Sequence, residues 1–371
     1  SFGGPVAHIG YFREAYVERL KWLKEERFAE LMALTQFLPG PASSQLGAAI
    51  GYERAGWLGG FGAWLGFTLP SALAMMVFAI GMGSIQDWFG GGWIHGLKLA
   101  AVAVVAIALM GMRKALCPRW PETLMALASL LVLFLLPVAW LQPVVIFLGG
   151  LLGVMIFRGQ VDQEPVERKS RMPLAGISFA LLVFAALLLV PLLFPENRDV
   201  EGTGGLLRAG ALVFGGGHVV LPLLETGTVG TGLVDKDSFL AGYGAAQAVP
   251  GPLFTFGSFL GSEMNLFGNV WLGGAVGTAA IFLPGMVLLA GGLPVWNRLK
   301  QFAWARAGVQ GANATVVGVL GAALLGMLTR GSVTGVADFA GVVLLALAIN
   351  FKCLPVWALV ILAAVLGGVV F

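Results

Sequence analysis

Apolar runs long enough to cross a bilayer recur along the chain and are separated by shorter polar segments. A membrane-spanning helix needs about 20 apolar residues. Nine stretches reach or approach that length: 57–83, 92–112, 123–137, 138–157, 174–194, 269–293, 304–327, 333–350 and 354–371. Pro137 and Pro143 interrupt the long run at 123–157, which predicts two spans joined by a tight turn. The pattern predicts an all-α polytopic membrane protein.

Composition excludes the other broad classes of protein. Of the 371 residues, 58% are hydrophobic and only 11% are charged. A water-soluble domain of this size needs a more polar surface, and a disordered chain needs far fewer apolar residues. The net charge of +3 gives no sign of a nucleic-acid partner. Two distant cysteines, Cys117 and Cys353, do not suggest a disulfide framework.

The basic residues predict how the spans are oriented. Lys and Arg gather at 113–119, in the polar linker 158–173, at 298–306 and at Lys352. Cytoplasmic loops are enriched in these residues, and the number of intervening spans allows all four segments to lie inside. The acidic segment 195–204 then falls outside as a loop.

The chain contains a repeat with a shift of 211 residues. Phe28, Gln36 and the Pro-Gly-Pro at 39–41 recur as Phe239, Gln247 and the Pro-Gly-Pro at 250–252. Two carboxylates, Glu14 and Glu26, recur as Glu225 and Asp237, and Phe-Gly-Gly at 2–4 recurs at 214–216. The order of basic and uncharged loops is reversed between the copies, which predicts an inverted-topology repeat.

The repeat predicts three parts of the chain. They are a first half at 1–157, a linker with an extra transmembrane helix at 158–204, and a second, inverted half at 205–371. An apolar segment at 206–213 precedes the second Phe-Gly-Gly, so we expect about a dozen or more residues upstream of Ser1 as well.

Each Pro-Gly-Pro predicts a broken helix at membrane depth. The apolar pieces 28–38 and 42–52 are too short to span, and Arg27 and Arg54 place both outer ends in the cytoplasm. This pattern predicts a re-entrant hairpin with Pro-Gly-Pro at its tip. The second half repeats it from the opposite face, so the two tips would meet near the midplane.

The breaks predict an anion-binding site. A helix that ends leaves carbonyls free, and one that begins leaves N–H donors and the positive end of its dipole. The Phe-Gly-Gly elements are interpreted as second breaks facing the same cavity. The candidate substrate-binding residues are Gly3, Gly4, Gln36, Pro39, Gly40, Pro41, Ser43, Ser44, Gln45, Gly215, Gly216, His218, Gln247, Pro250, Gly251, Pro252 and Thr255. Ser43 and Ser44 could equally serve as helix caps.

Four further residues are candidates for coupling or gating: His8, Arg13, Glu14 and Glu225. A carboxylate inside a membrane is a proton-relay candidate. Glu14, however, lies in a dense run of charges, which is equally typical of a solvated amphipathic face. His8 could be a hydrogen-bonded filler, and Arg13 could neutralise an entering anion.

No pattern typical of an enzyme is present in the sequence. We find no metal-ligand spacing, no phosphate-binding loop and no nucleophile with a paired histidine. We therefore predict a protein that is not an enzyme and has no cofactor and no metal site.

The duplicated motifs resemble those of the chromate ion transporter family. They are Ser-Phe-Gly-Gly-Pro at 1–5, Thr-Gln-Phe-Leu-Pro-Gly-Pro at 35–41, Phe-Gly-Gly-Gly-His at 214–218 and Ala-Gln-Ala-Val-Pro-Gly-Pro at 246–252. The resemblance is to long-chain members and covers nearly the whole sequence. It implies two fused homologous halves in a prokaryotic plasma (inner) membrane. It also implies export of chromate, a tetrahedral dianion similar to sulfate, and hence chromate resistance.

Several alternatives stay open at this point. The same scaffold suits a transporter of sulfate or another small anion, or a passive anion channel. Membrane potential, ion coupling or both would drive transport. The expected partners are chromate or a sulfate-like oxyanion and the lipid bilayer. Glycine-rich faces would permit a homodimer without requiring one.

Overall fold

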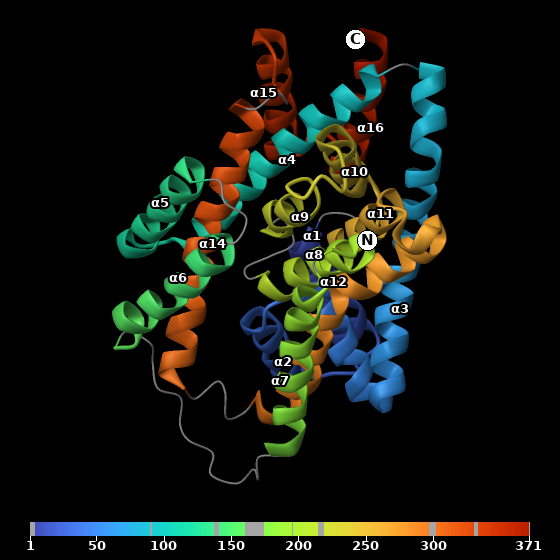
Figure 1. Ribbon diagram of the computed structural model, residues 1–371. Coiled ribbons are helices and arrows are strands. Elements are labelled where there is room, and N and C mark those ends of the chain that lie inside the picture. The colour runs from blue at the N-terminus through green and yellow to red at the C-terminus, as the bar shows by residue number, and fades with distance from the viewer. Residues whose placement is uncertain are drawn as a thin grey trace.

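The computed structural model describes residues 4–89, 91–136, 141–159, 174–194, 196–213, 219–296, 302–329 and 333–370. The regular elements within these ranges are helices (Figure 1). The first half contains α1 (Gly4–Arg13), the π-helix η1 (Glu14–Arg19), α2 (Glu25–Phe37), α3 (Ala42–Phe89), α4 (Gly92–Leu116), α5 (Trp120–Leu135) and α6 (Leu141–Phe157).

A connecting helix and a second series follow. The connection is α7 (Leu174–Leu189) with η2 (Val190–Leu193). The second half contains α8 (Arg198–Leu212), α9 (Val220–Thr228), α10 (Lys236–Ala248), η4 (Leu253–Thr255), α11 (Phe256–Glu263), η5 (Leu266–Gly268), α12 (Val270–Gly292), η6 (Leu293–Val295), α14 (Ala303–Thr329), α15 (Val336–Asn350) and α16 (Val356–Val370).

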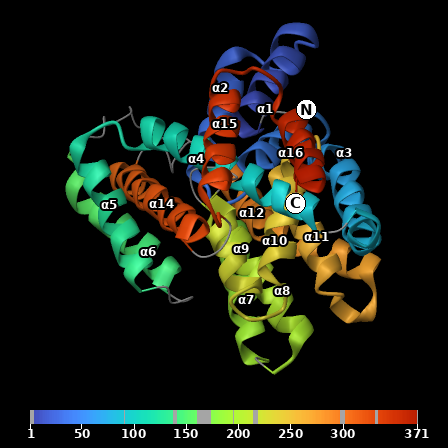
Figure 2. The ribbon, with the colours of Figure 1, turned by 90° about the horizontal axis from the view of Figure 1, so that it is seen from above.

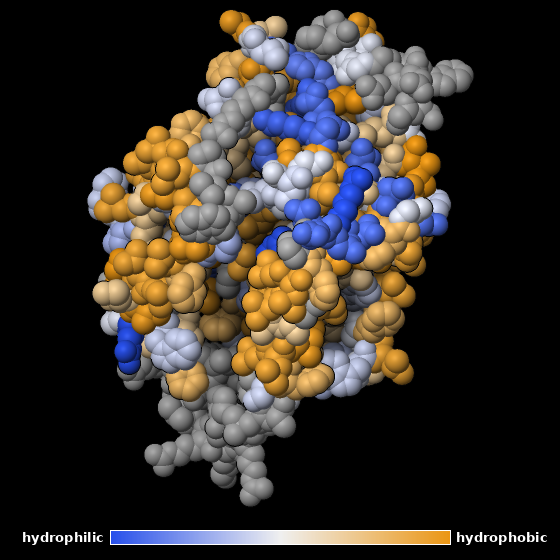
Figure 3. Space-filling view, in the orientation of Figure 1, coloured by the Kyte–Doolittle hydropathy of each residue, from blue (hydrophilic) through white to orange (hydrophobic). Residues whose placement is uncertain are grey.

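Helices occupy all nine apolar stretches that the sequence predicts as spans. In the described part of the chain, α3, α4, α12 and α14 are long and apolar enough to cross a membrane by themselves. Shorter apolar helices account for the other five stretches. Figure 3 shows hydrophobic side chains over α5, α6 and α7, and hydrophilic ones over the region of α8 to α10. Exposed Phe147, Met155 and Phe179 belong to that apolar surface, as expected where lipid replaces water. The protein is a multi-pass membrane protein.

One polar segment is helical where the sequence suggests a loop. The acidic segment 195–204 was predicted as an external loop, but α8 begins within it at Arg198. The Asn197 side chain accepts a hydrogen bond from the backbone N–H of Val200 at 3.1 Å and so caps the helix. Asp199 and Glu201 lie in the first turn, where they complement the positive end of the helix dipole.

α3 reverses direction near its start. Ala55 and Gly56 have non-helical backbone angles, and Gly56 has φ +61°. The segments on either side pack face to face at Gly51 and Gly59, where neither position has room for a Cβ. α11 and α12 form the corresponding hairpin, with close contact between Gly261 and Gly273. Glycine thus allows the backbones of both hairpins to approach closely.

The two halves are interleaved. The short helices α5 and α6 pack along α14 of the other half, and α15 and α16 pack along α4 (Figures 1 and 2). Gly153 lies against the backbone of Ala307, and Gly96 lies against the backbone of Ala363. Each long helix is therefore covered by the short hairpin of the opposite half.

Candidate anion-binding site

The first Pro-Gly-Pro separates two helices. α2 ends at Phe37, Leu38 is extended, and α3 begins at Ala42. Gly40 between them has φ +124°, a conformation that strongly favours glycine. Proline on both sides removes two N–H donors, so the α2 hydrogen-bond ladder cannot continue. The break leaves irregular, largely buried backbone between two apolar helices.

The second Pro-Gly-Pro has the same local structure. α10 ends at Ala248, Val249 is extended, and the 3₁₀ turn η4 leads into α11. Gly251 has φ +138°. The bounds of α10 are those of α2 displaced by the 211-residue shift of the sequence repeat.

Each break packs against a proline-containing span of the other half. A Cβ on Gly40 would lie 2.9 Å from Cα of Gly285, which follows Pro284 in α12. A Cβ on Gly251 would lie 2.8 Å from Cβ of Ser71, which follows Pro70 in α3. The sequence predicts that the two tips meet, but the atoms nearest a Cβ on Gly251 all belong to α3, and those nearest a Cβ on Gly40 belong to Gly285 and Gln45.

A backbone hydrogen bond also joins the first break to the second half. The N–H of Gly40 donates to the carbonyl of Val213 at 2.7 Å. Val213 directly precedes the second Phe-Gly-Gly motif. The first break thus lies close to the segment that the sequence also assigned to the site.

Gln45 makes hydrogen bonds within the protein. It was predicted as an amide donor to the anion, but its Nε2 donates to the carbonyls of Pro39 at 3.1 Å and Gly285 at 2.8 Å. Both bonds are inside the protein, so this amide fastens the break to α12. Ser43 and Ser44 are buried beside it, and the Ser44 hydroxyl has no hydrogen-bond partner. A buried hydroxyl without a partner is costly and is a natural donor for a ligand.

At the second break too, one polar side chain is hydrogen-bonded within the protein and another has a donor without a partner. The Thr255 hydroxyl donates to the carbonyl of Pro252 at 2.9 Å and therefore closes its own turn. Gln247, three residues before the break, has a buried Nε2 without a hydrogen-bond partner. Gln247 and Ser44 are thus predicted residues that each hold a buried donor without a hydrogen-bond partner.

Gln36, the counterpart of Gln247, lines a cavity of about 620 Å³. Its walls are α2, the end of α4, Trp296 and α14. Three polar residues of α14 face this space: Arg306, Gln310 and Asn313. The sequence predicts Arg306 as a topology marker and does not single out Gln310 or Asn313. Their spacing within an apolar helix places all three on one face, which was the available signal.

The four coupling candidates lie in different surroundings. His8 is buried with its ring edge-on to Phe67. Glu14 is exposed on η1. This position agrees with the alternative that its run of charges forms a solvated face. Arg13 is exposed and binds Glu18 and, at 2.8 Å, Glu25.

The last coupling candidate, Glu225, lines a separate cavity of about 220 Å³ with Lys236 and Gln142. That cavity lies between α5, α6, α9, the start of α10 and α14. The structure therefore does not bring the two repeated carboxylates together at one site.

Gly3, Gly215, Gly216 and His218 lie outside the described residues, and Gly4 begins α1. Across the ranges that the structure describes, no cluster of three or more His, Cys, Asp or Glu residues could hold a metal ion.

The fold and site define a class: a multi-pass membrane protein whose two helix breaks are held at the contact between its halves. Within that class, the chain belongs to the chromate transporter family, whose model matches residues 1–154 and 204–368. The match covers most of the chain in two stretches.

Curated relatives span nearly the same length. A chromate transport protein of Pseudomonas aeruginosa is 28% identical over 341 residues, covering 87% of this chain and 76% of that protein. A chromate transport protein of Cupriavidus metallidurans is 28% identical over 381 residues, covering 100% and 90%. A probable chromate transport protein of Synechococcus elongatus is 26% identical over 385 residues, covering 100% and 92%. No solved structure matches the chain.

Proposed function

We propose that the protein is a secondary transporter of a prokaryotic plasma membrane that exports chromate from the cytoplasm. Family membership and the names of the relatives support the substrate. The observation that carries the proposal is the pair of Pro-Gly-Pro breaks, each packed on the proline-containing span of the other half. Irregular backbone at membrane depth is tolerated where it is buried or lines a cavity, and substrate sites use it.

The chemistry of the breaks suits a tetrahedral dianion. Each helix start offers about half a positive charge and free N–H groups. Near the breaks, the hydroxyl of Ser44 and the amide of Gln247 are neutral donors. A site built from such groups binds a dianion less tightly than paired cations would, and a transporter must also release its substrate.

Alternation between two inverted halves is the mechanism we infer. The interleaved packing of α5–α6 on α14 and α15–α16 on α4 supports the inverted repeat, because equivalent elements exchange places across the two halves. Helix α10 packs directly on α4, with Gly244 against the backbone of Leu97, and we call this pair closed. The equivalent helices α2 and α14 are separated by the cavity of about 620 Å³, and we call this pair open. Transport would exchange the closed and open arrangements around the two breaks.

The membrane potential favours export of such an ion. Moving one charge across 100 mV corresponds to about 2.3 kcal/mol. For a dianion leaving a negative interior this is roughly 4–5 kcal/mol, or about a thousandfold in concentration. Export can therefore proceed on the potential alone, with ion coupling as an addition.

Substitution of the two break glycines tests the proposal. Gly40→Ala and Gly251→Ala place a Cβ at positive φ against atoms of the opposite half. We expect both variants to reach the membrane but to lose most chromate uptake into inside-out vesicles. Gly66→Ala is the matched control, because a Cβ there meets no atom within 4 Å. Normal uptake by both break variants would refute the site.

The same vesicles separate the alternatives. Competition by sulfate against labelled chromate, with sulfate itself accumulated faster, would assign the protein to sulfate transport instead. Unitary currents in planar bilayers with no saturation by chromate would assign it to passive channels.

A further inference from the structure

The cavity between α2 and α14 has a polar wall on α14, and the residues of this wall take no part in the two Pro-Gly-Pro breaks. The polar residues that line the cavity are spaced at i, i+4 and i+7 along α14: Arg306, Gln310 and Asn313. Polar and charged residues in a membrane-spanning helix face a water-filled space or the protein interior, where they usually have a function.

The corresponding helix α4 is apolar at two of these three positions. The residues at the positions equivalent to Gln310 and Asn313 are Leu99 and Val102, and both are buried. Those apolar side chains belong to the large hydrophobic core. The residue equivalent to Arg306 is His95, which is polar but lies 2.9 Å from the Asp338 carboxylate.

Charged side chains of both signs line the cavity, Glu26 and Glu30 on α2 and Arg306 on α14. Glu30 is paired with Arg27 at 2.9 Å. Glu26 is exposed at the α2 wall. Arg306 supplies a permanent positive charge with a planar set of donors that matches a tetrahedral oxyanion. The amides of Gln36 and Asn313 add neutral polar groups further along the two helices.

We propose that this cavity is the loading site of the transporter, in which Arg306, with the amides of Gln36 and Asn313, binds a tetrahedral oxyanion before it reaches the helix breaks. This inference rests on the proposed function, and it assigns the site to a step before translocation. A volume of about 620 Å³ accommodates such an ion together with hydrating water. The ion then keeps part of its hydration while it exchanges with the cytoplasm, where the positive-inside rule places this end of α14.

The decisive variant is Arg306→Gln, measured by initial rates of chromate uptake into inside-out vesicles over a range of concentrations. We expect the half-saturating concentration to rise about tenfold, because one charge-assisted contact in a hydrated cavity is lost. The maximal rate should change by less than about twofold, because the breaks are intact. Arg306→Lys should show a smaller rise, since the charge remains but the planar donors are lost.

Arg54→Gln is the matched control. Arg54 is exposed, lies over the Trp22 ring and carries a positive charge on the same predicted side of the membrane. Its removal should leave the half-saturating concentration unchanged. An equal rise in both variants would indicate a general surface-charge effect, and no rise in Arg306→Gln would also overturn the loading site.

A second variant keeps the proposal testable if Arg306→Gln fails to fold. Asn313→Asp adds a negative charge to the same face and should raise the half-saturating concentration by a similar factor. An unchanged value in that variant would overturn the proposal.

Equilibrium binding separates failure of the loading site from failure of the proposed function. If wild-type vesicles take up no chromate, radiolabelled sulfate is measured on purified protein. Sulfate binding that weakens in Arg306→Gln supports the loading site while the chromate function fails. Equal sulfate binding by both proteins, or none by either, refutes the loading site.

Discussion

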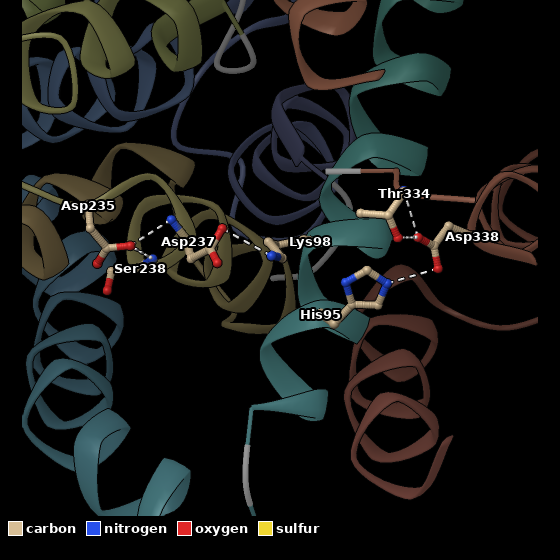
Figure 4. A network of polar contacts seen from close by, with 7 residues as sticks. All are labelled: His95, Lys98, Asp235, Asp237, Ser238, Thr334 and Asp338. Atoms are coloured by element: carbon tan, nitrogen blue, oxygen red, sulfur yellow. Dashed lines mark hydrogen bonds and ion pairs between the residues drawn. The ribbon is translucent and has the colours of Figure 1, made fainter. Parts of the chain in front are cut away.

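Two pairs of helices that are equivalent in the repeat differ in how they meet. α10 packs directly on α4, whereas α2 is separated from α14 by the large cavity. In the closed pair, Gly244 lies against the backbone of Leu97, and Lys98 pairs with Asp237 at 3.0 Å (Figure 4). One chain therefore presents the same pair of elements once closed and once open.

Individual side chains account for the difference. The residue equivalent to Gly244 is Ala33, and the residue equivalent to Lys98 is Val309. Glu26 stands where the closed pair has Asp237. Ala33, Val309 and Glu26 all line the open cavity. The open pair thus lacks both the glycine contact and the ion pair of the closed pair, which makes its separation less costly.

The largest effect is expected from leucine at the equivalent positions of the two pairs. Gly244→Leu would force a side chain against the Leu97 carbonyl, which a Cβ would already approach to 2.8 Å. We expect a loss of several kcal/mol, since overpacking alone costs about 1–3 kcal/mol. Ala33→Leu projects into the cavity and should change stability by less than about 1 kcal/mol. Thermal unfolding in detergent, followed by tryptophan fluorescence, compares them; equal destabilisation would contradict the open–closed distinction.

Thiol accessibility should also separate the pairs. In a background lacking Cys117 and Cys353, Ala29→Cys faces the cavity, and its equivalent Leu240→Cys is buried against the core. A water-soluble maleimide should modify position 29 at least about tenfold faster, because position 240 reacts only after local opening. Similar rates would show that both pairs are open in the membrane.

The ion pair of the closed interface should contribute modestly. Lys98 is 11% exposed at its side chain, but Asp237 is 63% exposed, so solvent screens much of their attraction. A double-mutant cycle with Lys98→Met and Asp237→Asn should give a coupling of about 0.5–1 kcal/mol. The control is Glu26→Gln, because Glu26 is exposed and the residue equivalent to Lys98 is the uncharged Val309; it should leave stability within about 0.5 kcal/mol. A comparable loss of stability in Glu26→Gln would contradict the claim that only the closed pair is held by an ion pair.

The smallest perturbation uses the two native cysteines to decide which membrane face the open cavity meets. Burial raises the pKa of the Cys117 thiol to about 11, so at pH 7 only about one thiol in ten thousand is ionised. Cys353 is exposed beside Lys352. An impermeant maleimide at pH 7 should therefore label Cys353 in inside-out vesicles and not in intact cells. Labelling of Cys353 in intact cells would reverse the predicted orientation.

Much of the fold was predictable because hydrophobic length is a local property. Each of the nine apolar stretches contains a helix, and the Pro-Gly-Pro breaks occur where proline removes donors. α8 was missed because its polar composition suggested a loop, although Asn197, Asp199 and Glu201 form a good helix start. Here a capping signal outweighed the hydrophobicity pattern.

The site was less predictable because its contacts join distant segments. Gln45 and Gly285 are 240 residues apart, and nothing local to Gln45 shows that its amide holds α12. The cavity depends on whether α2 touches α14, which the repeat alone leaves undetermined. Spacing could have singled out Arg306, Gln310 and Asn313, but only the cavity gives those residues a common surface.

The interleaved halves also constrain how the protein is made. α4 has little space for any side chain at Gly96, where it receives the backbone of α16. A ribosome adding about 5–20 residues per second completes α4 many seconds before α16 exists. During that interval the glycine surface of α4 must be occupied by lipid or by the insertion machinery. A nascent chain arrested before α15 would therefore keep α4 uncovered, so biogenesis of the first half is complete only after the second half has been inserted.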